Sequence, residues 1–215
     1  MNQYQLYIFD WDGTLMNSIN KIVHSLQAAA QAVNLPIPDE SASKGIIGAS
    51  LTQASKILFP GIEQIKIDEL IKHYKQQYLE INATPSPLYE DAEQLLLTLH
   101  AKEKLLAVAT GKGRQGLERV LAVSNTKHLF HLTKSSDDAK SKPHPEMLEQ
   151  ILLELDVKPE HALMIGDSRY DLKMAEHAGV DSIGITHGAG CISSLTECNP
   201  KAIVHSIKEL AALIL

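Results

Sequence analysis

The sequence predicts an α/β fold, a doubly wound parallel sheet interrupted by an inserted α-helical segment. In the second half of the chain, short apolar runs of strand length alternate with stretches of helical periodicity. This alternation is typical of a parallel sheet with helices on both faces. Another apolar run, Leu6-Tyr7-Ile8-Phe9, precedes a long all-helical stretch. We therefore expect that stretch to be an insertion between the first strand and the rest of the core.

The inserted segment is predicted to hold helices separated by proline-containing breaks. The first covers 18–33, where Ser18 could cap it and apolar residues recur on one face. Two more are predicted over 50–58 and 65–79, and a proline-rich stretch at 84–87 looks like a linker. We interpret the tyrosines of the last helix as core residues (Tyr74, Tyr78).

The remaining elements alternate between strand and helix. The run Leu105-Leu106-Ala107-Val108-Ala109 is continuously apolar, as in a strand buried on both faces. Pro143 and Pro145 start one helix, and Gly179 ends another. The predicted helices cover 91–102, 116–123, 146–155, 170–178 and 207–215, and the predicted strands cover 105–109, 129–133, 162–165, 182–185 and 202–205.

Composition narrows the classes of function. The 215-residue chain carries a net charge of −6, which does not suggest a nucleic-acid partner because phosphate backbones select basic surfaces. The two cysteines make no disulfide framework, and neither a signal peptide nor a membrane-span pattern is found. We expect a cytoplasmic protein, monomeric or homodimeric, without nucleic-acid or membrane partners.

Two carboxylates, Asp10 and Asp12, stand one residue apart directly after the first predicted strand. Acidic groups crowded at a strand end repel one another unless a cation pairs with them. Mg²⁺ is the obvious partner because it is a hard ion that seeks oxygen ligands. The stretch Asp10-Trp11-Asp12-Gly13-Thr14 therefore favours a Mg²⁺ site, and the alternative is a helix cap or a solvated acidic turn.

Other polar segments follow the later strands, where a parallel sheet binds its ligands. We expect them to meet at one rim, although each has a plain alternative as a tight turn, a solvated lysine or a helix cap. They are Thr110-Gly111-Lys112-Gly113, Lys142 in Ser141-Lys142-Pro143, and Gly166-Asp167-Ser168 followed by Asp171. Lys112 and Arg114 either meet an anionic leaving group or begin the next helix.

Together these segments resemble the four motifs of the haloacid dehalogenase (HAD) superfamily of phosphohydrolases, in the right order over the whole chain. The helical insertion resembles the small cap of the subgroup that contains phosphoglycolate phosphatases and β-phosphoglucomutases. The resemblance implies a Rossmann-like core of residues 1–16 and 86–215 and an inserted α-helical cap of residues 17–85. The motifs are Asp10-x-Asp12-Gly13-Thr14, Thr110-Gly111-Lys112, Lys142, and Gly166-Asp167-Ser168-x-x-Asp171.

The resemblance implies a Mg²⁺-dependent phosphatase that hydrolyses a small phosphorylated metabolite through an aspartyl-phosphate. Asp10 would attack phosphorus, and Asp12 would protonate the leaving oxygen and then deprotonate the attacking water. Thr110, Gly111 and Lys142 would bind the phosphate, Lys142 as a fixed point charge.

The same resemblance implies the metal ligands. Asp10 and Asp167 would hold Mg²⁺ through their side chains, and Asp12 through its backbone carbonyl. Asp171 would support the metal or its waters.

Residues near the cap refine this expectation. Asp12 favours phosphoryl transfer, because the acid/base position of the family's dehalogenases is not acidic. Asn17 stands where the subgroup commonly has Asp, and we expect altered cap coupling with no loss of chemistry.

The turn containing Lys44, Gly45 and Gly48 resembles the loop that caps aim at the leaving group. Lys44 either binds an anionic group of the substrate, forms a Schiff base, or is solvated.

Two alternative functions stay open at this point. One is a phosphomutase of the β-phosphoglucomutase kind, although the cap has no convincing sugar-binding pattern. The other is a catalytically idle family member that serves as a binding or scaffold subunit, although all four motifs are present. A phosphatase acting on a metabolite such as 2-phosphoglycolate is the function that we favour.

Overall fold

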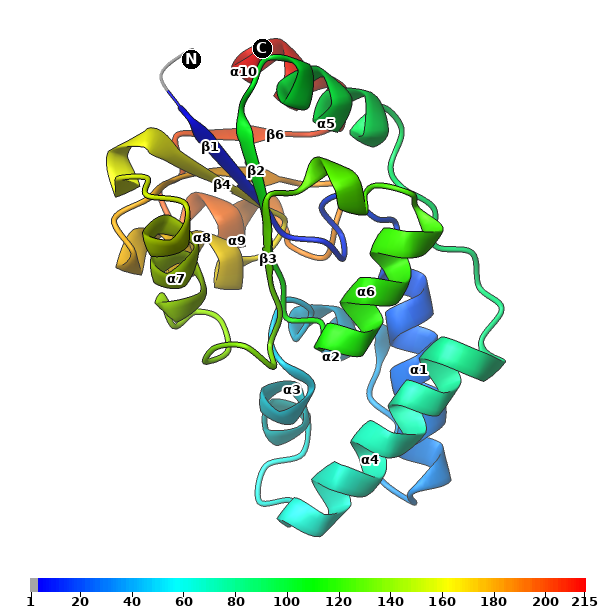
Figure 1. Ribbon diagram of the computed structural model, residues 1–215. Helices are drawn as coiled ribbons and strands as arrows, with labels where there is room; N and C mark the ends of the chain where they lie inside the picture. Colours follow the sequence, from blue (N-terminus) through cyan, green and yellow to red (C-terminus); the bar gives the residue numbers. More distant parts are fainter. Residues whose placement is uncertain (1–3) are drawn as a thin grey trace.

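The computed structural model describes residues 4–215, and its centre is a six-stranded parallel sheet in the order β3-β2-β1-β4-β5-β6 (Figure 1). β1 lies between β2 and β4, with Leu6 opposite both Leu105 and Ala162. The predicted fold class is confirmed. The strands are β1 (Leu6–Phe9), β2 (Leu105–Ala109), β3 (Leu132–Lys134), β4 (Ala162–Gly166), β5 (Asp181–Ile185) and β6 (Ala202–Val204).

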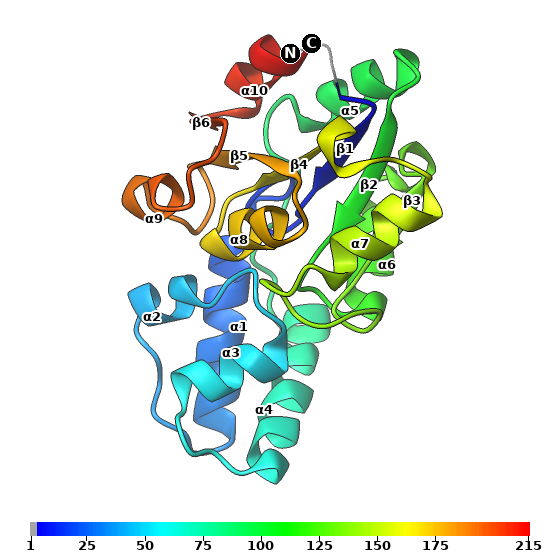
Figure 2. The same ribbon diagram turned by 90° about the vertical axis from the view of Figure 1, so that its left-hand side faces the viewer.

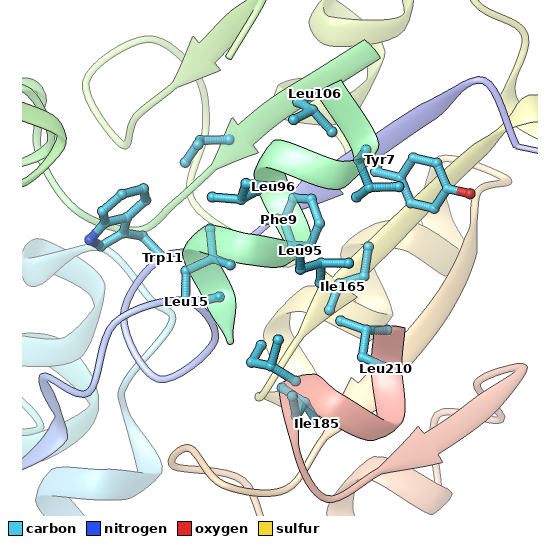
Figure 3. Packing of buried hydrophobic residues seen from close by; sticks show 14 of the residues in the cluster. Tyr7, Phe9, Trp11, Leu15, Leu95, Leu96, Leu106, Ile165, Ile185 and Leu210 are labelled. Carbon is cyan, nitrogen blue, oxygen red and sulfur yellow. The ribbon is translucent and has the colours of Figure 1, made fainter. Parts of the chain in front are cut away.

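Both faces of the sheet are covered by helices because the central strands are apolar on both sides. In β1, Tyr7 and Phe9 pack into one cluster with α5 and α10, while Leu6 and Ile8 pack into another with α7 and α8. Figure 3 shows Leu95 beside Phe9 on the first face, and Leu210 near Ile165 in the same cluster. The helices are α5 (Ala92–Ala101), α6 (Arg114–Val123), α7 (Glu146–Glu154), α8 (Arg169–His177) and α10 (Ile207–Ile214).

The segment between β1 and α5 folds into helices on one side of the sheet, beneath the core in Figure 2. These helices share an apolar cluster of their own, in which Leu26 of α1 packs with Leu70 and Tyr74 of α4. They are α1 (Ile19–Ala32), α2 (Glu40–Gly45), α3 (Leu51–Leu58), α4 (Gln64–Gln76) and the π-helix η1 (Gln77–Ile81). We call these helices and their loops the cap.

The two chain segments that join the cap to the sheet lie side by side. Met16 and Leu88 form an antiparallel bridge. The Asn17 N–H donates to the Pro87 carbonyl at 2.8 Å, and the Tyr89 N–H donates to the Leu15 carbonyl at 2.9 Å. The predicted boundaries at 16/17 and 85/86 stay a prediction.

Several elements differ from the expectation. The strand predicted over 129–133 lies at Leu132–Lys134, because Lys127–Leu129 forms a 3-10 turn that buries Leu129. Two short helices were not predicted, α2 and α9 (Ile192–Thr196). Within residues 4–215, no helix combines the length and the apolar character needed to cross a membrane.

Candidate active site

Three carboxylates gather where β1 and β4 end. Asp10 follows β1, Asp167 follows β4, and Asp171 lies in the first turn of α8. One oxygen atom of each lies within 4.8 Å of one atom of each of the others, and all three residues are buried. Hard, buried oxygen ligands of this kind suit a divalent cation.

Lys142 provides the positive charge beside this cluster. Its side chain is fully buried, and its Nζ lies 2.8 Å from Asp10 Oδ1 and 2.5 Å from Asp171 Oδ1. Asp10 and Asp171 are thereby tied together from two different elements. One ammonium cannot neutralise three carboxylates, so the donor set retains negative charge that a divalent cation would balance.

Burial raises the pKa values of Asp10 and Asp167. It raises the pKa of Asp10 to about 7, even though the Lys142 ammonium lowers it. Burial also raises the pKa of Asp167, and the neighbouring carboxylates of Asp10 and Asp171 raise it further. Low-dielectric surroundings and like charges both disfavour the ionised form, and a bound cation would reverse that balance.

Asp171 has a second role as part of the helix cap. The Ser168 N–H and hydroxyl both donate to Asp171 Oδ2, at 3.0 and 2.6 Å. Ser168 and Asp171 therefore form a capping box at the start of α8. The alternative that Asp167 caps this helix is wrong.

Asp167 is held by the loop of residues 187–190, which follows β5. The Ala189 N–H donates to Asp167 Oδ2 at 2.7 Å, and the Thr14 hydroxyl donates to Oδ1 at 2.8 Å. A Cβ atom at Gly188 or Gly190 would lie 2.1 Å from an Asp167 oxygen. The two glycines around Ala189 were the signal available in the sequence, since glycine permits such a close approach.

Asp12 lies outside the group of three carboxylates. Its carboxylate accepts a hydrogen bond from the Ser18 hydroxyl at 2.6 Å and pairs with Lys112 Nζ at 2.9 Å. Ser18 is the N-cap residue of α1, as expected, but its side chain makes no capping hydrogen bond. Its hydroxyl orients Asp12 instead.

A cavity of about 100 Å³ opens beside these residues, between sheet edge and cap. Asp10, Asp12, Thr110 and Gly111 line it from the sheet. Apolar and aromatic cap residues line the opposite side, namely Ile22, Ile46, Ile47, Leu51, Tyr74 and Tyr78. The two tyrosines are buried core residues, as predicted, and they also form part of this wall.

Two glycines let the cap approach the sheet. A Cβ atom at Gly111 would lie 2.6 Å from the Gly48 carbonyl oxygen. Gly48 itself has a φ of +102°, in the region that favours glycine. Both glycines also line the cavity.

The rest of the predicted cap loop lies elsewhere. Lys44 pairs with Glu40 at 2.6 Å, and it lines a separate cleft together with Gly45 and Arg169. The structure thus brings Gly48 to the cavity but not Lys44 or Gly45. Asn17 is exposed at the first linker, where its backbone N–H contacts the second one.

Comparison with known proteins identifies the family. The model of the haloacid dehalogenase-like hydrolases matches residues 7–185. The chain is 28% identical to a phosphoglycolate phosphatase of Haemophilus influenzae, with 99% of each chain covered. It is 31% identical to a pyrophosphatase of Bacillus cereus, with 83% of this chain and 82% of the relative covered.

A solved structure supports the same assignment. The crystal structure of a predicted phosphoglycolate phosphatase from Haemophilus somnus has a TM-score of 0.85 and 26% identity, with 99% of each chain covered. The sequence and fold comparisons therefore agree. The chain belongs to the haloacid dehalogenase-like hydrolase family and is an enzyme whose relatives are named phosphatases.

Proposed function

We propose that the protein is a Mg²⁺-dependent phosphatase that hydrolyses a small phosphorylated metabolite through an aspartyl-phosphate, as phosphoglycolate phosphatase would. One observation carries the proposal. The buried Asp10 carboxylate lies 2.8 Å from the Lys142 ammonium and within 4.8 Å of the carboxylates of Asp167 and Asp171, and it also lines the cavity. Asp10 is therefore positioned to meet a phosphate group in the cavity and to share a divalent cation with the other two carboxylates.

The first step forms a bond between Asp10 and phosphorus. An oxygen of the Asp10 carboxylate attacks the phosphoryl group, and the bond from phosphorus to the leaving oxygen breaks. Lys142 holds the Asp10 carboxylate in place and offers positive charge to the phosphoryl oxygens. The Thr110 hydroxyl and the backbone N–H groups near Gly111 bind the same oxygens.

Asp12 moves the protons. It donates a proton to the leaving oxygen in the first step. In the second step it takes a proton from water, whose oxygen bonds to phosphorus as the Asp10–phosphorus bond breaks. Its carboxylate is fixed for this by Ser18 and Lys112.

The residues that would hold Mg²⁺ are Asp10, Asp167 and Asp171, with the Asp12 backbone carbonyl as a further ligand. When bound, the ion supplies positive charge that offsets the negative charge of the phosphoryl group during transfer. The loop at Gly188–Gly190 keeps Asp167 in place for this role.

The proposal extends to organisation and location. We propose a core of residues 1–16 and 86–215 and a cap of 17–85 that closes over the cavity. The free thiols of Cys191 and Cys198 favour a reducing compartment, and the cytoplasm is our proposed location. Light scattering would distinguish a monomer from a homodimer.

Phosphate release from a panel of compounds tests this function. The panel contains 2-phosphoglycolate, pyrophosphate, sugar phosphates, nucleotides and p-nitrophenyl phosphate. We expect release with Mg²⁺, loss of release with EDTA, and loss in Asp10→Asn. The exposed Asp68→Asn is the matched control, because it removes a cap carboxylate far from these contacts. Release by Asp10→Asn at the rate of the wild type would overturn the aspartyl-phosphate mechanism.

A further inference from the structure

The cavity contains one largely buried cation to which the proposed phosphoryl chemistry gives no contact with the substrate, only the fixing of Asp12. Lys112 follows β2, and its side chain is only 8% exposed. Its Nζ pairs with Asp12 Oδ2 at 2.9 Å, donates to the Tyr78 hydroxyl at 3.3 Å, and lies 4.4 Å from the centre of the Tyr78 ring. Lys75, the other lysine in the cavity wall, is exposed.

The Lys112 ammonium is not fully satisfied by the protein. A lysine ammonium has three N–H donors. Among the described residues, Asp12 and Tyr78 supply an acceptor for two of them. A donor left without an acceptor in a poorly hydrated site costs free energy, so an acceptor from a bound substrate would be favoured there.

Two further cations, Lys21 and Arg119, lie close enough to interact electrostatically and add positive charge near Lys112, whereas Asp137 adds negative charge to the cavity wall. Lys21 lies 5.2 Å from the Tyr78 ring on the cap, and Arg119 donates to the Leu79 carbonyl at 2.5 Å. Through its ion pair with Asp12, the Lys112 ammonium brings a positive charge to the cavity wall of a chain whose net charge is −6.

The other walls of the cavity restrict the size and polarity of the rest of the leaving group. Ile47, Leu51 and Tyr74 offer apolar surface, and the cavity has a volume of about 100 Å³. An anionic group of the substrate would bind the Lys112 ammonium. That ammonium is paired with the Asp12 carboxylate, which is proposed to protonate the leaving oxygen. The charge of the substrate would thus lie within a few bonds of its ester oxygen.

We propose that Lys112 is a specificity-determining residue that selects phosphomonoesters whose small leaving group carries a carboxylate close to the ester oxygen. This inference rests on the proposed phosphatase function and assigns the residue that would recognise the leaving group. One ammonium with one free donor matches a single carboxylate better than a dianionic second phosphate.

A matched pair of substrates tests the inference. 2-Phosphoglycolate and 2-hydroxyethyl phosphate differ mainly in a carboxylate against a neutral alcohol. We expect wild type to have the higher kcat/KM for 2-phosphoglycolate. In Lys112→Met the ratio of the two kcat/KM values should fall about tenfold, the scale of one charge-assisted hydrogen bond. Lys112→Arg should restore much of the ratio. Lys72→Met, at an exposed lysine of α4 outside the cavity wall, should leave it unchanged.

The outcomes separate this inference from the function on which it rests. Equal kcat/KM values for the two substrates in wild type would overturn the role of Lys112, as would parallel losses in Lys112→Met. Parallel losses together with a shifted pH profile on both substrates would mean that Lys112 only positions Asp12. No phosphate release from either substrate or the wider panel would instead overturn the proposed phosphatase.

Discussion

The Tyr89 ring lies flat against the imidazole of His187, with centroids 3.7 Å apart and an interplanar angle of 15°. The Tyr89 hydroxyl also donates to the His187 carbonyl at 3.0 Å, and His187 Nε2 lies 3.1 Å from the Thr14 carbonyl. Since the Thr14 hydroxyl binds Asp167, these contacts join the second cap linker to the loop around the proposed metal ligand.

Removing this stack should weaken metal binding more than it weakens chemistry. Tyr89→Leu takes away both the ring and the hydroxyl that hold the 187–190 loop. We expect the Mg²⁺ concentration for half-maximal activity to rise about tenfold, the lower end of the range for outer-shell changes. Tyr89→Phe keeps the ring and should shift it less. An unchanged Mg²⁺ requirement in Tyr89→Leu would show that the stack does not support the metal site.

Asp167→Asn should stabilise the metal-free protein at alkaline pH. The pKa of Asp167 is raised in the fold, so the folded protein binds this proton more tightly than the unfolded chain does. Metal-free wild type therefore loses stability as pH rises from about 4, the ordinary range of Asp, through the raised pKa. The asparagine can still accept from the Ala189 N–H while carrying no charge.

Thermal unfolding in EDTA at pH 5 and pH 8 measures this effect. We expect Asp167→Asn to exceed the wild-type Tm by about 3 °C at pH 8, which corresponds to about 1 kcal/mol in a chain of this size, and by less at pH 5. Adding Mg²⁺ should raise the wild-type Tm and leave that of the variant nearly unchanged. A lower Tm for the variant at pH 8 would contradict the conclusion that the buried charge of Asp167 destabilises the metal-free protein.

Leu96→Ala should destabilise the core. Leu96 is fully buried between α5 and the sheet (Figure 3), and replacing such a residue by alanine leaves a cavity that costs about 3 kcal/mol. Urea unfolding would measure the loss. The neighbouring Leu97 is 40% exposed, so Leu97→Ala should cost much less. Equal losses in both variants would show that the packing of α5 is not as described.

The two thiols should differ in reactivity with pH. Hydrogen bonds from Ser193 and Ser194 lower the pKa of the exposed Cys191 to about 7, whereas burial raises the pKa of Cys198. Because the thiolate is the nucleophile, iodoacetamide should label Cys191 with a midpoint near pH 7 and Cys198 slowly throughout. Mass spectrometry of the labelled protein from pH 5.5 to 9 checks both rates, and faster labelling of Cys198 would refute the difference.

The strands and the convergence of the motifs could be predicted because they depend on local patterns. A continuous apolar run identifies a buried strand, and parallel strands bring their carboxyl ends to one edge. Asp10, Asp167 and Lys142 therefore meet as expected. The helix α2 escaped prediction because six mostly polar residues show no periodicity, although Asp39 caps it through the Ala42 N–H.

Long-range side-chain pairing was beyond the sequence. Nothing local indicates that Lys112 would pair with Asp12, or that Ser18 would turn from its helix to the same carboxylate. The pair of Lys44 and Glu40 is local by contrast, since it follows from the one-turn spacing within α2, which had first to be known as a helix. The two contacts of Asp12 depend on how separate elements pack.

The adjacent linkers would allow the cap to be removed as one segment. Because the Asn17 N–H already touches the Pro87 carbonyl, the chain leaves the sheet and returns to it through a single gap. Removing the residues between them would leave two ends that a tight turn can rejoin without stretching β1 or α5. Because the two linkers lie so close together, a different helical segment could be inserted at this point. The same sheet would then carry another cap.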